Sequence, residues 1–384
     1  MRKFIPYGRQ YIDEEDVKAV LEVLNSDFIT QGPKIREFEE KLAKKVGAKY
    51  AVVFNSGTSA LHAVYYALGL KEGDEFITTP ITFVATANAG RFLGANPIFA
   101  DVEPDTGNID PKEVERLITP KTRLISVVHY AGHPVDLEPI REIAQKYNLK
   151  VVEDGCHALG ARYKGTPIGA CKYSDATVFS FHPVKHITTG EGGAVLTNDR
   201  EIYEKLLMFR NHGITRDGKR FLNEPHGDWY YEMQFLAPNY RITDLQAALG
   251  ISQLKKLDFF VKRRREIAQV YNETFKGNPY FDLPPERDYA FHSYHLYPVR
   301  LKPHLWEKKK EIFRKLREEG VGVQVHYIPV YWQPYYQGLG YRKGVCPKAE
   351  DFYRSEISLP LYPAMEESDI EFVVEKVFKV FKEI

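Results

Sequence analysis

The stretch "DATVFSFHPVKHITTGEGGAVLTN", residues 175–198, places a glycine-rich loop with a single lysine between two runs of apolar and β-branched residues. Such runs are typical of buried strands. Lys185 lies in the loop between His182 and His186. A surface lysine needs no such surroundings, whereas a reactive lysine needs a fixed loop and a pKa lowered by desolvation or nearby cations. The stretch therefore predicts two strands of a sheet and a candidate reactive lysine between them.

The alternation of strands and helices extends over residues 50–200. Further apolar runs occur at 51–54, 75–80, 124–130 and 150–155. Helical patterns follow the first three of these runs. β-branched runs of this length, separated by helices, predict an α/β fold with a large, mostly parallel sheet and helices on both faces. Ligands of such sheets bind beyond the carboxyl ends of the strands, so we expect the functional residues there.

The chain changes character after about residue 245. Residues 243–275 predict one long amphipathic helix, with the basic run at 262–265 on its solvent face. Strand-like segments and helices alternate beyond it, with strands at 293–301 and 321–330 and helices at about 306–319 and 367–382. Because 384 residues suit two domains of roughly 100–200 each, we expect a large domain over 1–245 and a smaller C-terminal α+β domain over 246–384.

Charge and cysteine content exclude several classes of function. The 53 basic and 52 acidic residues leave a net charge of +1, which gives no electrostatic case for a nucleic-acid or membrane partner. Cys156, Cys171 and Cys346 share no metal-type spacing and predict reduced thiols and no metal site. The start shows no secretory signal, and no apolar run approaches the roughly 18 residues of a membrane span. We expect a cytoplasmic protein.

Polar and small residues follow several of the predicted strands. In "FNSGTSAL", residues 54–61, Gly57 and Thr58 open a helix whose N-terminus either suits a phosphate or is simply capped by Ser56 or Thr58. The lysine of a nucleotide P-loop is missing there. Ser180 offers a further hydroxyl to a phosphate at the end of the 175–182 run.

Asp154 ends a very apolar strand, and His157 follows three residues later. A buried carboxylate must pair with a cation or a strong donor, although a helix N-cap is an equal alternative. Phe83 follows another strand, and by itself it predicts a core residue rather than a stacking surface. Together, Lys185, Asp154, Phe83 and the hydroxyl-rich turns match what pyridoxal phosphate needs: an amine, a carboxylate, a stacking ring and a phosphate cup.

The sequence resembles the DegT/StrS family of nucleotide-sugar aminotransferases over nearly its whole length. The segments that carry the resemblance are "TQGPKIREFEEKLAKKVGAKYAVVFNSGTSAL", "TTPITFVATANA", "EDGCHALGARYKG", "FSFHPVKHITTGEGGAVLTND", "RNHGI", "NYRITDLQAALGISQLKKLD" and "VQVHYIPVY". The likeness is greatest to the members of pseudaminic acid biosynthesis, through "IPYGRQYIDEEDV", "TGNIDP" and "WYYEMQ". It implies the aspartate-aminotransferase-like fold, known as fold type I, and pyridoxal 5'-phosphate as cofactor.

The resemblance also implies a role for individual residues. Lys185 matches the lysine that joins the cofactor aldehyde as a Schiff base, and Asp154 the partner of the pyridine nitrogen. The other matches are Phe83, stacked on the ring; His157, beside its phenolic oxygen; Gly57, Thr58 and Ser180, around the phosphate; Asn239, which reaches the phosphate of the second subunit; and His326, in the sugar-nucleotide site. The role of Asn239 implies a homodimer with shared active sites.

The activity implied by the resemblance is transamination from an amino acid, expected to be L-glutamate, to the 4-keto group of a UDP-linked 4-keto-6-deoxy sugar. An aminotransferase for a GDP- or dTDP-linked keto sugar is the first alternative. Dehydration is a second, because some relatives carry histidine at the lysine position, but the spacing from Ser180 places Lys185 rather than His186 there. A non-catalytic regulator that binds the same cofactor is a third, against which the Lys185–Asp154 pair argues.

Overall fold

The computed structural model describes residues 3–384, and a seven-stranded sheet forms its centre. The strand order is β1-β9-β8-β5-β4-β2-β3. The bounds are β1 Tyr50–Phe54, β2 Glu75–Thr78, β3 Asn96–Phe99, β4 Thr122–Val128, β5 Lys150–Asp154, β8 Ala176–Ser180 and β9 Gly193–Thr197. Only β9 runs opposite to the other six strands, so the prediction of a mostly parallel sheet is confirmed. The short β3 was not predicted.

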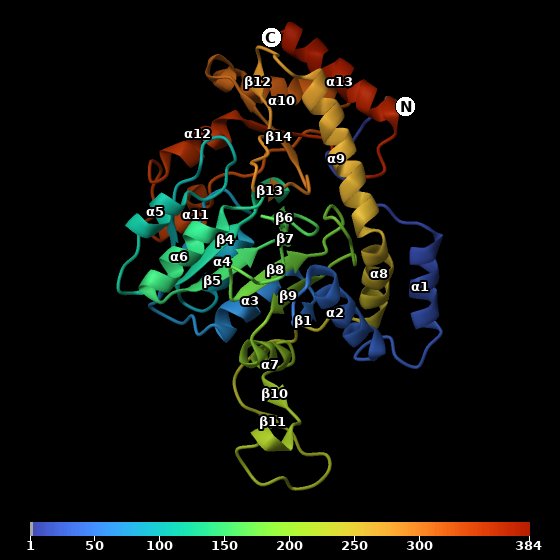
Figure 1. Ribbon diagram of the computed structural model, residues 1–384, viewed down its shortest axis with the longest axis vertical. Helices are drawn as coiled ribbons and strands as arrows, with labels where there is room; N and C mark the ends of the chain where they lie inside the picture. Colours follow the sequence, from blue (N-terminus) through green and yellow to red (C-terminus); the bar gives the residue numbers. More distant parts are fainter. Residues whose placement is uncertain (1–2) are drawn as a thin grey trace.

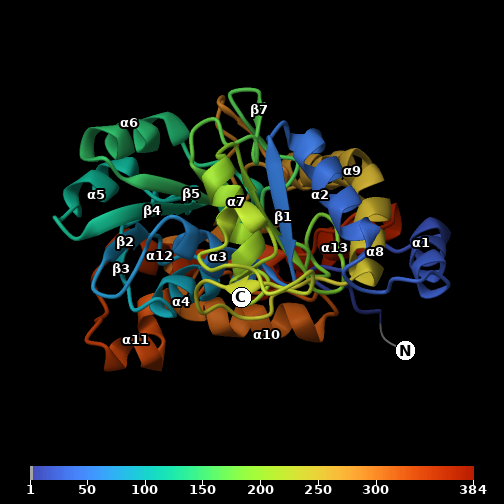
Figure 2. The ribbon, with the colours of Figure 1, turned by 90° about the horizontal axis from the view of Figure 1, so that it is seen from below.

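Helices cover both faces of this sheet, as predicted (Figures 1 and 2). Neighbouring strand residues point to opposite faces, so Val53 packs in one core cluster and Val52 in another. The first cluster contains α2 Pro33–Val46, α5 Pro111–Arg116, α6 Leu137–Tyr147 and α8 Asp244–Lys255. The second contains α3 Gly57–Ala67, α4 Ala85–Arg91 and α7 Arg200–Phe209. Helix α1, Glu14–Leu24, packs on α8.

The prediction of one continuous helix over 243–275 is wrong. The segment divides into α8 and α9, Leu257–Thr274, at Lys256. The amide of Lys256 bonds to the carbonyls of Gln253 and Leu254, which tightens the last turn of α8. The Lys256 ammonium lies 2.7 Å from Asp13 and 2.6 Å from Asp16, which are at the start of α1.

The basic run at 262–265 is also not a uniformly solvated face. Arg264 is 1% exposed. Its guanidinium donates hydrogen bonds to the carbonyls of Tyr294, His295 and Leu361, at 3.0–3.3 Å. Burial lowers the pKa of Arg264 to about 9. The prediction of a solvated face was wrong for Arg264 because α9 packs against other segments on more than one side.

The C-terminal part forms its own sheet and core. Its strands are β12 Phe281–Asp282, β14 Tyr297–Leu301 and β15 Glu356–Leu359, in the order β12-β14-β15. Helices α10 Lys309–Glu318 and α13 Glu367–Lys382 pack with this sheet, and a 3₁₀-helix, Pro303–Lys308, precedes α10. Helices α11 Pro334–Gly338 and α12 Pro347–Ser355 belong to a separate cluster, which they share with Phe99 of β3 and Ala87 of α4. The strand predicted over 321–330 is wrong: this segment makes only isolated bridges, at Val321 and Gln324.

Two small sheets lie outside the two main sheets. Strands β6 Arg162–Tyr163, β7 Thr166–Pro167 and β13 Ala290–Phe291 form a small sheet. Strands β10 Ile214–Thr215 and β11 Glu232–Met233 form an arm that projects from the body below α7 (Figure 1). Further 3₁₀-helices span Tyr130–Gly132, Gly218–Arg220 and Val330–Trp332. Within residues 3–384, no helix is long and apolar enough to cross a membrane.

Candidate active site

The carboxyl ends of β1, β2, β5 and β8 meet at one pocket of about 820 Å³. This is the position expected for a ligand of a parallel sheet. The pocket is lined by every predicted site residue except Asn239: Gly57, Thr58, Phe83, Asp154, His157, Ser180, Lys185 and His326. Its volume is in the range of small-molecule sites, which is roughly 300–1,000 Å³. Sequence reasoning did not find Tyr7, Thr82, Thr86, Gln246 and Tyr327, which also line it.

Lys185 stands in the loop after β8. Its backbone amide bonds to the carbonyl of His182 at 2.9 Å, which closes a tight turn. Burial lowers the pKa of the Lys185 ammonium, and the positive charge of Arg264 adds to this. His186 does not line the pocket, and its Nε2 lies 3.1 Å from the carbonyl oxygen of Ser293. The loop therefore presents Lys185, and not His186, to the pocket.

Asp154 ends β5 and is 4% exposed. The Thr86 hydroxyl, on α4, donates to its Oδ2 at 2.7 Å, and the Cys156 amide donates to its Oδ1 at 3.1 Å. No helix begins directly after β5 among the described residues, so the N-cap alternative for Asp154 is wrong. A buried carboxylate with two neutral donors is ready to hold a cationic group in the pocket.

His157 is held in a single tautomer. Its Nδ1 accepts a hydrogen bond from the Ala131 amide at 3.2 Å, so the proton lies on Nε2. Nε2 lies 3.0 Å from the hydroxyl of Tyr327, to which it donates. Burial, together with the charge of Lys185, lowers the pKa of His157 well below its usual value. The imidazole is therefore a neutral donor to Tyr327.

The N-terminus of α3 forms an anion cradle beside Ser180. Ser56 caps the helix by accepting from the Ser59 amide, which leaves the amides of Gly57 and Thr58 without a partner within residues 3–384. A Cβ at Gly57 would come within 3.0 Å of the Ser180 Cβ. Glycine at 57 therefore keeps the cradle open, and the capping and phosphate interpretations are compatible.

Phe83 and Asn239 differ from what their neighbours in sequence suggest. Phe83 is 59% exposed, so the prediction of a core phenylalanine is wrong, and its ring lies 6.3 Å from that of Tyr327. Asn239 is exposed and outside the pocket, and its side-chain oxygen accepts from the Arg241 amide at 3.2 Å. The structure of one chain leaves the role of Asn239 in a second subunit as a prediction.

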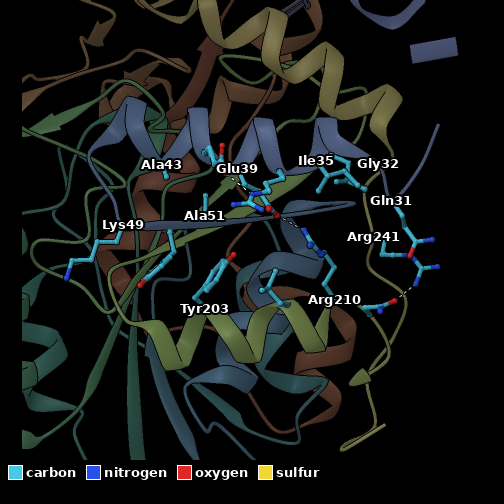
Figure 3. A pocket seen from close by; sticks show the side chains of 16 residues that line it. Gln31, Gly32, Ile35, Glu39, Ala43, Lys49, Ala51, Tyr203, Arg210 and Arg241 are labelled. Atoms are coloured by element: carbon cyan, nitrogen blue, oxygen red, sulfur yellow. Dashed lines mark hydrogen bonds and ion pairs between the residues drawn. The ribbon is translucent and has the colours of Figure 1, made fainter. Parts of the chain in front are cut away.

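Figure 3 shows a second cavity, of about 710 Å³, between α2 and α7. Several of the charged side chains that line it already have partners. Arg210 lies 2.6 Å from Glu39, and Arg241 bonds to Asn211. Lys185 is not part of this cavity. We therefore assign the chemistry to the pocket around Lys185.

The donor set around Lys185 fits pyridoxal phosphate. An amine of lowered pKa suits an aldehyde, a buried carboxylate suits a pyridinium, and a helix N-terminus with free amides suits a phosphate. An exposed aromatic ring at the pocket wall suits a flat ligand. Fold and site together define an enzyme of the aspartate-aminotransferase-like class that depends on this cofactor.

Comparison with known proteins places the chain within that class. Residues 10–378 match the DegT/DnrJ/EryC1/StrS aminotransferase family, and the chain belongs to this family. A Campylobacter jejuni UDP-4-amino-4,6-dideoxy-N-acetyl-beta-L-altrosamine transaminase is 42% identical over 383 residues, which cover 99% of this chain and 98% of that one.

Two solved structures share the fold over the full length. Helicobacter pylori PseC, an aminotransferase of pseudoaminic acid biosynthesis, is 41% identical, with a TM-score of 0.93 and 100% coverage of both chains. A sugar aminotransferase of Streptococcus pneumoniae, Spr1654 in its PLP form, is 29% identical, with a TM-score of 0.92 and 99% coverage of both. The predictions of the fold, of an aminotransferase and of pyridoxal phosphate are thereby confirmed.

Proposed function

We propose that this enzyme transfers the amino group of an amino acid, L-glutamate, to the 4-keto carbon of a UDP-linked 4-keto-6-deoxy sugar of the 2-acetamido-2,6-dideoxy-hexos-4-ulose type. The observation that carries the proposal is the half-buried Lys185, whose pKa is lowered by desolvation and which shares one pocket with the buried Asp154. The substrate class rests on relatives of about 42% identity whose names specify such sugars. A role in pseudaminic acid biosynthesis follows from the same likeness.

Each part of the cofactor would have a partner in the pocket. Lys185 would hold its aldehyde carbon, and Asp154 would hold the protonated ring nitrogen. The amides of Gly57 and Thr58 and the Ser180 hydroxyl would bind the phosphate. Phe83 would stack on the ring, and His157 would lie beside the ring and its phenolic oxygen. Pyridoxal phosphate, when bound, supplies an electron-withdrawing ring that takes up the electrons released at the substrate carbon.

The side chain that moves the proton is Lys185. Its Nζ takes the proton from the α-carbon of the amino donor, and in the second half-reaction it delivers a proton to C4 of the sugar. A general base must be unprotonated at the working pH, and burial lowers the pKa of Lys185 in that direction. Asp154 remains in place throughout, because Thr86 and the Cys156 amide hold both of its oxygens.

The working unit in this proposal is a cytoplasmic homodimer with shared active sites. The β10–β11 arm and the segment after it project from the body and carry exposed apolar side chains (Figure 1). Leu222, Trp229 and Leu236 are 78%, 74% and 84% exposed. A second copy of the chain would cover this surface and bring its Asn239 to the neighbouring phosphate cup.

A panel of keto-sugar nucleotides, assayed with L-glutamate, tests the substrate. The expected result is turnover of the UDP-linked 4-keto-6-deoxy sugar with formation of 2-oxoglutarate. A faster reaction with a GDP- or dTDP-linked sugar would show that the proposed substrate is wrong, while the proposed transamination would stand. Tight cofactor binding without turnover of any keto sugar would favour the non-catalytic regulator instead.

A further inference from the structure

His326 lies at the end of a buried chain of hydrogen bonds that starts outside the pocket. The carboxylate of Glu356, on β15, accepts from the His326 amide at 2.8 Å and from the Ser358 hydroxyl at 2.5 Å. The Ser358 hydroxyl also lies 2.8 Å from Nδ1 of His326. Glu356 and Ser358 are both 0% exposed, so no water competes for these bonds.

The direction of the chain determines which nitrogen of His326 carries a proton. An ionised carboxylate only accepts, so the single hydroxyl proton of Ser358 points to Glu356. Ser358 must then accept from His326, which places the imidazole proton on Nδ1. The pKa of His326 is lowered to about 3 by burial and by the charge of Lys185, so the ring holds no second proton. Nε2 is left with a lone pair.

Nε2 of His326 has no hydrogen-bond partner among residues 3–384, although the ring lines the pocket. Its side chain is 6% exposed. The rings of Tyr7 and Tyr327 lie 5.4 and 5.0 Å away, and Tyr130 holds the His326 carbonyl with a hydrogen bond of 2.6 Å. The ring is held on its Nδ1 side, and it lines the pocket, so Nε2 is a fixed acceptor that a ligand donor can meet there.

We propose that Glu356 and Ser358 are positioning residues that hold His326 in the Nδ1-protonated tautomer, so that Nε2 accepts a hydrogen bond from a hydroxyl of the sugar substrate. The tautomer is inferred from the hydrogen bonds among Glu356, Ser358 and His326 and does not depend on the proposed function. The hydroxyl partner rests on the proposed function, because a keto sugar brings hydroxyl donors into the pocket. A site that hydrogen-bonds a substrate hydroxyl discriminates strongly against analogues without it.

Nitrogen-15 NMR of histidine-labelled holoenzyme tests the tautomer, with the His326 signals identified by their loss in His326→Gln. Burial raises the pKa of Glu356 to about 7, against the opposing charge of Lys309, so a measurement at about pH 8.5 observes the ionised carboxylate. We expect a protonated Nδ1 and an unprotonated Nε2. A protonated Nε2 in the wild type would overturn the proposal.

Glu356→Gln should move the proton of the His326 ring from Nδ1 to Nε2. Its amide oxygen must face the His326 amide, so its NH₂ group donates to Ser358, and the serine hydroxyl then donates to Nδ1. The proton of His326 moves to Nε2 as a result. An unchanged Nδ1-protonated signal in this variant would show that Glu356 does not direct the ring.

Kinetic measurements test whether Nε2 of His326 binds a hydroxyl of the sugar substrate. Ser358→Ala should raise KM for the keto-sugar nucleotide about tenfold, with kcat and the KM for glutamate unchanged, because it weakens substrate binding rather than chemistry. Ser358→Thr should restore KM. Ser355→Ala is the matched control, since Ser355 is buried but donates only to the carbonyl of Phe352. A rise in the KM of glutamate alone, or a fall in kcat alone, would overturn the hydroxyl assignment. A wild type that accepts no keto sugar would overturn the proposed function while the NMR result stands.

Discussion

Thr86 on α4 and Asp154 at the end of β5 are joined by a hydrogen bond of 2.7 Å at the base of the pocket. The two residues are 68 positions apart in sequence. Thr86 also lies 2.8 Å from the hydroxyl of Thr82, and its carbonyl accepts from the Tyr65 hydroxyl. This network fixes the carboxylate that is proposed to hold the pyridine nitrogen, and it connects α3, α4 and the sheet.

Thr86→Val removes that hydrogen bond without changing the shape of the side chain. Hydrogen bonds to charged groups contribute roughly 1.5–3 kcal/mol, so we expect kcat to fall about 10- to 100-fold. Thr78→Val is the control: the Thr78 hydroxyl is buried but bonds to the carbonyl of Ser126. Equal losses in both variants would assign the effect to the core rather than to Asp154.

Asp154→Asn should fold and bind the cofactor but transfer amino groups slowly. An amide cannot hold the proton of a pyridinium, so the charge that develops at the substrate carbon is poorly stabilised. Loss of such an electrostatic partner costs on the order of 3 kcal/mol, or about a hundredfold in kcat. Rapid-quench measurement of each half-reaction checks this, and near-normal rates would leave Asp154 a purely structural role.

Lys185→Ala should abolish turnover, because one amine serves as attachment point and proton carrier. Borohydride treatment of the wild-type holoenzyme should fix the cofactor on the peptide that contains Lys185. Mass spectrometry of the digest identifies the labelled lysine. Label on a different lysine would refute the assignment of the site.

Asn239 is expected to complete the site of a neighbouring subunit. Light scattering should show a dimer, and a mixture of inactive Lys185→Ala with inactive Asn239→Ala should regain activity, since one site of the mixed dimer has both residues. Subunit exchange is verified separately with differently labelled chains. A mixture that exchanges but remains inactive would disprove shared sites.

Stability should decrease in acid because of His133. Its Nε2 accepts from the Arg287 amide at 3.1 Å and its Nδ1 lies 2.8 Å from the Pro134 carbonyl, so only the neutral ring satisfies both. Burial lowers the pKa of His133 to about 4. The unfolded chain, with a histidine pKa of about 6.5, then binds more protons than the folded one between pH 6.5 and about 4.

The contribution of His133 to the free energy of unfolding is therefore at its maximum above pH 6.5. It decreases by about 3 kcal/mol as the pH falls from 6.5 to about 4. Urea titrations at several pH values measure the slope. His133→Gln should flatten it, whereas His304→Gln, at an exposed position, should leave it unchanged. An unaltered slope in His133→Gln would assign the acid sensitivity to other buried histidines.

The strand ends were predictable because their pattern is local. Apolar runs with a period typical of strands, followed by Gly57, Asp154 or Lys185, place these residues at one edge of a parallel sheet whatever the details of packing. The errors arise where contacts are distant in sequence. Phe83 taken by itself suggested a core residue, and only the resemblance placed it at the pocket, where it lies. Arg264 was expected in solvent and bonds to carbonyls from two other segments.

By itself, the sequence determined the class of fold and the cofactor, and it predicted Lys185 as the reactive lysine, because each depends on residue types at fixed local spacing. Only the tertiary structure decided which side chains hold those residues in their working states. Thr86 reaches Asp154, Tyr327 reaches His157, and Glu356 reaches His326 across 68, 170 and 30 positions. Hydrogen bonds of this kind depend on distance and angle in space, and chain folding alone brings such partners within 3 Å of each other.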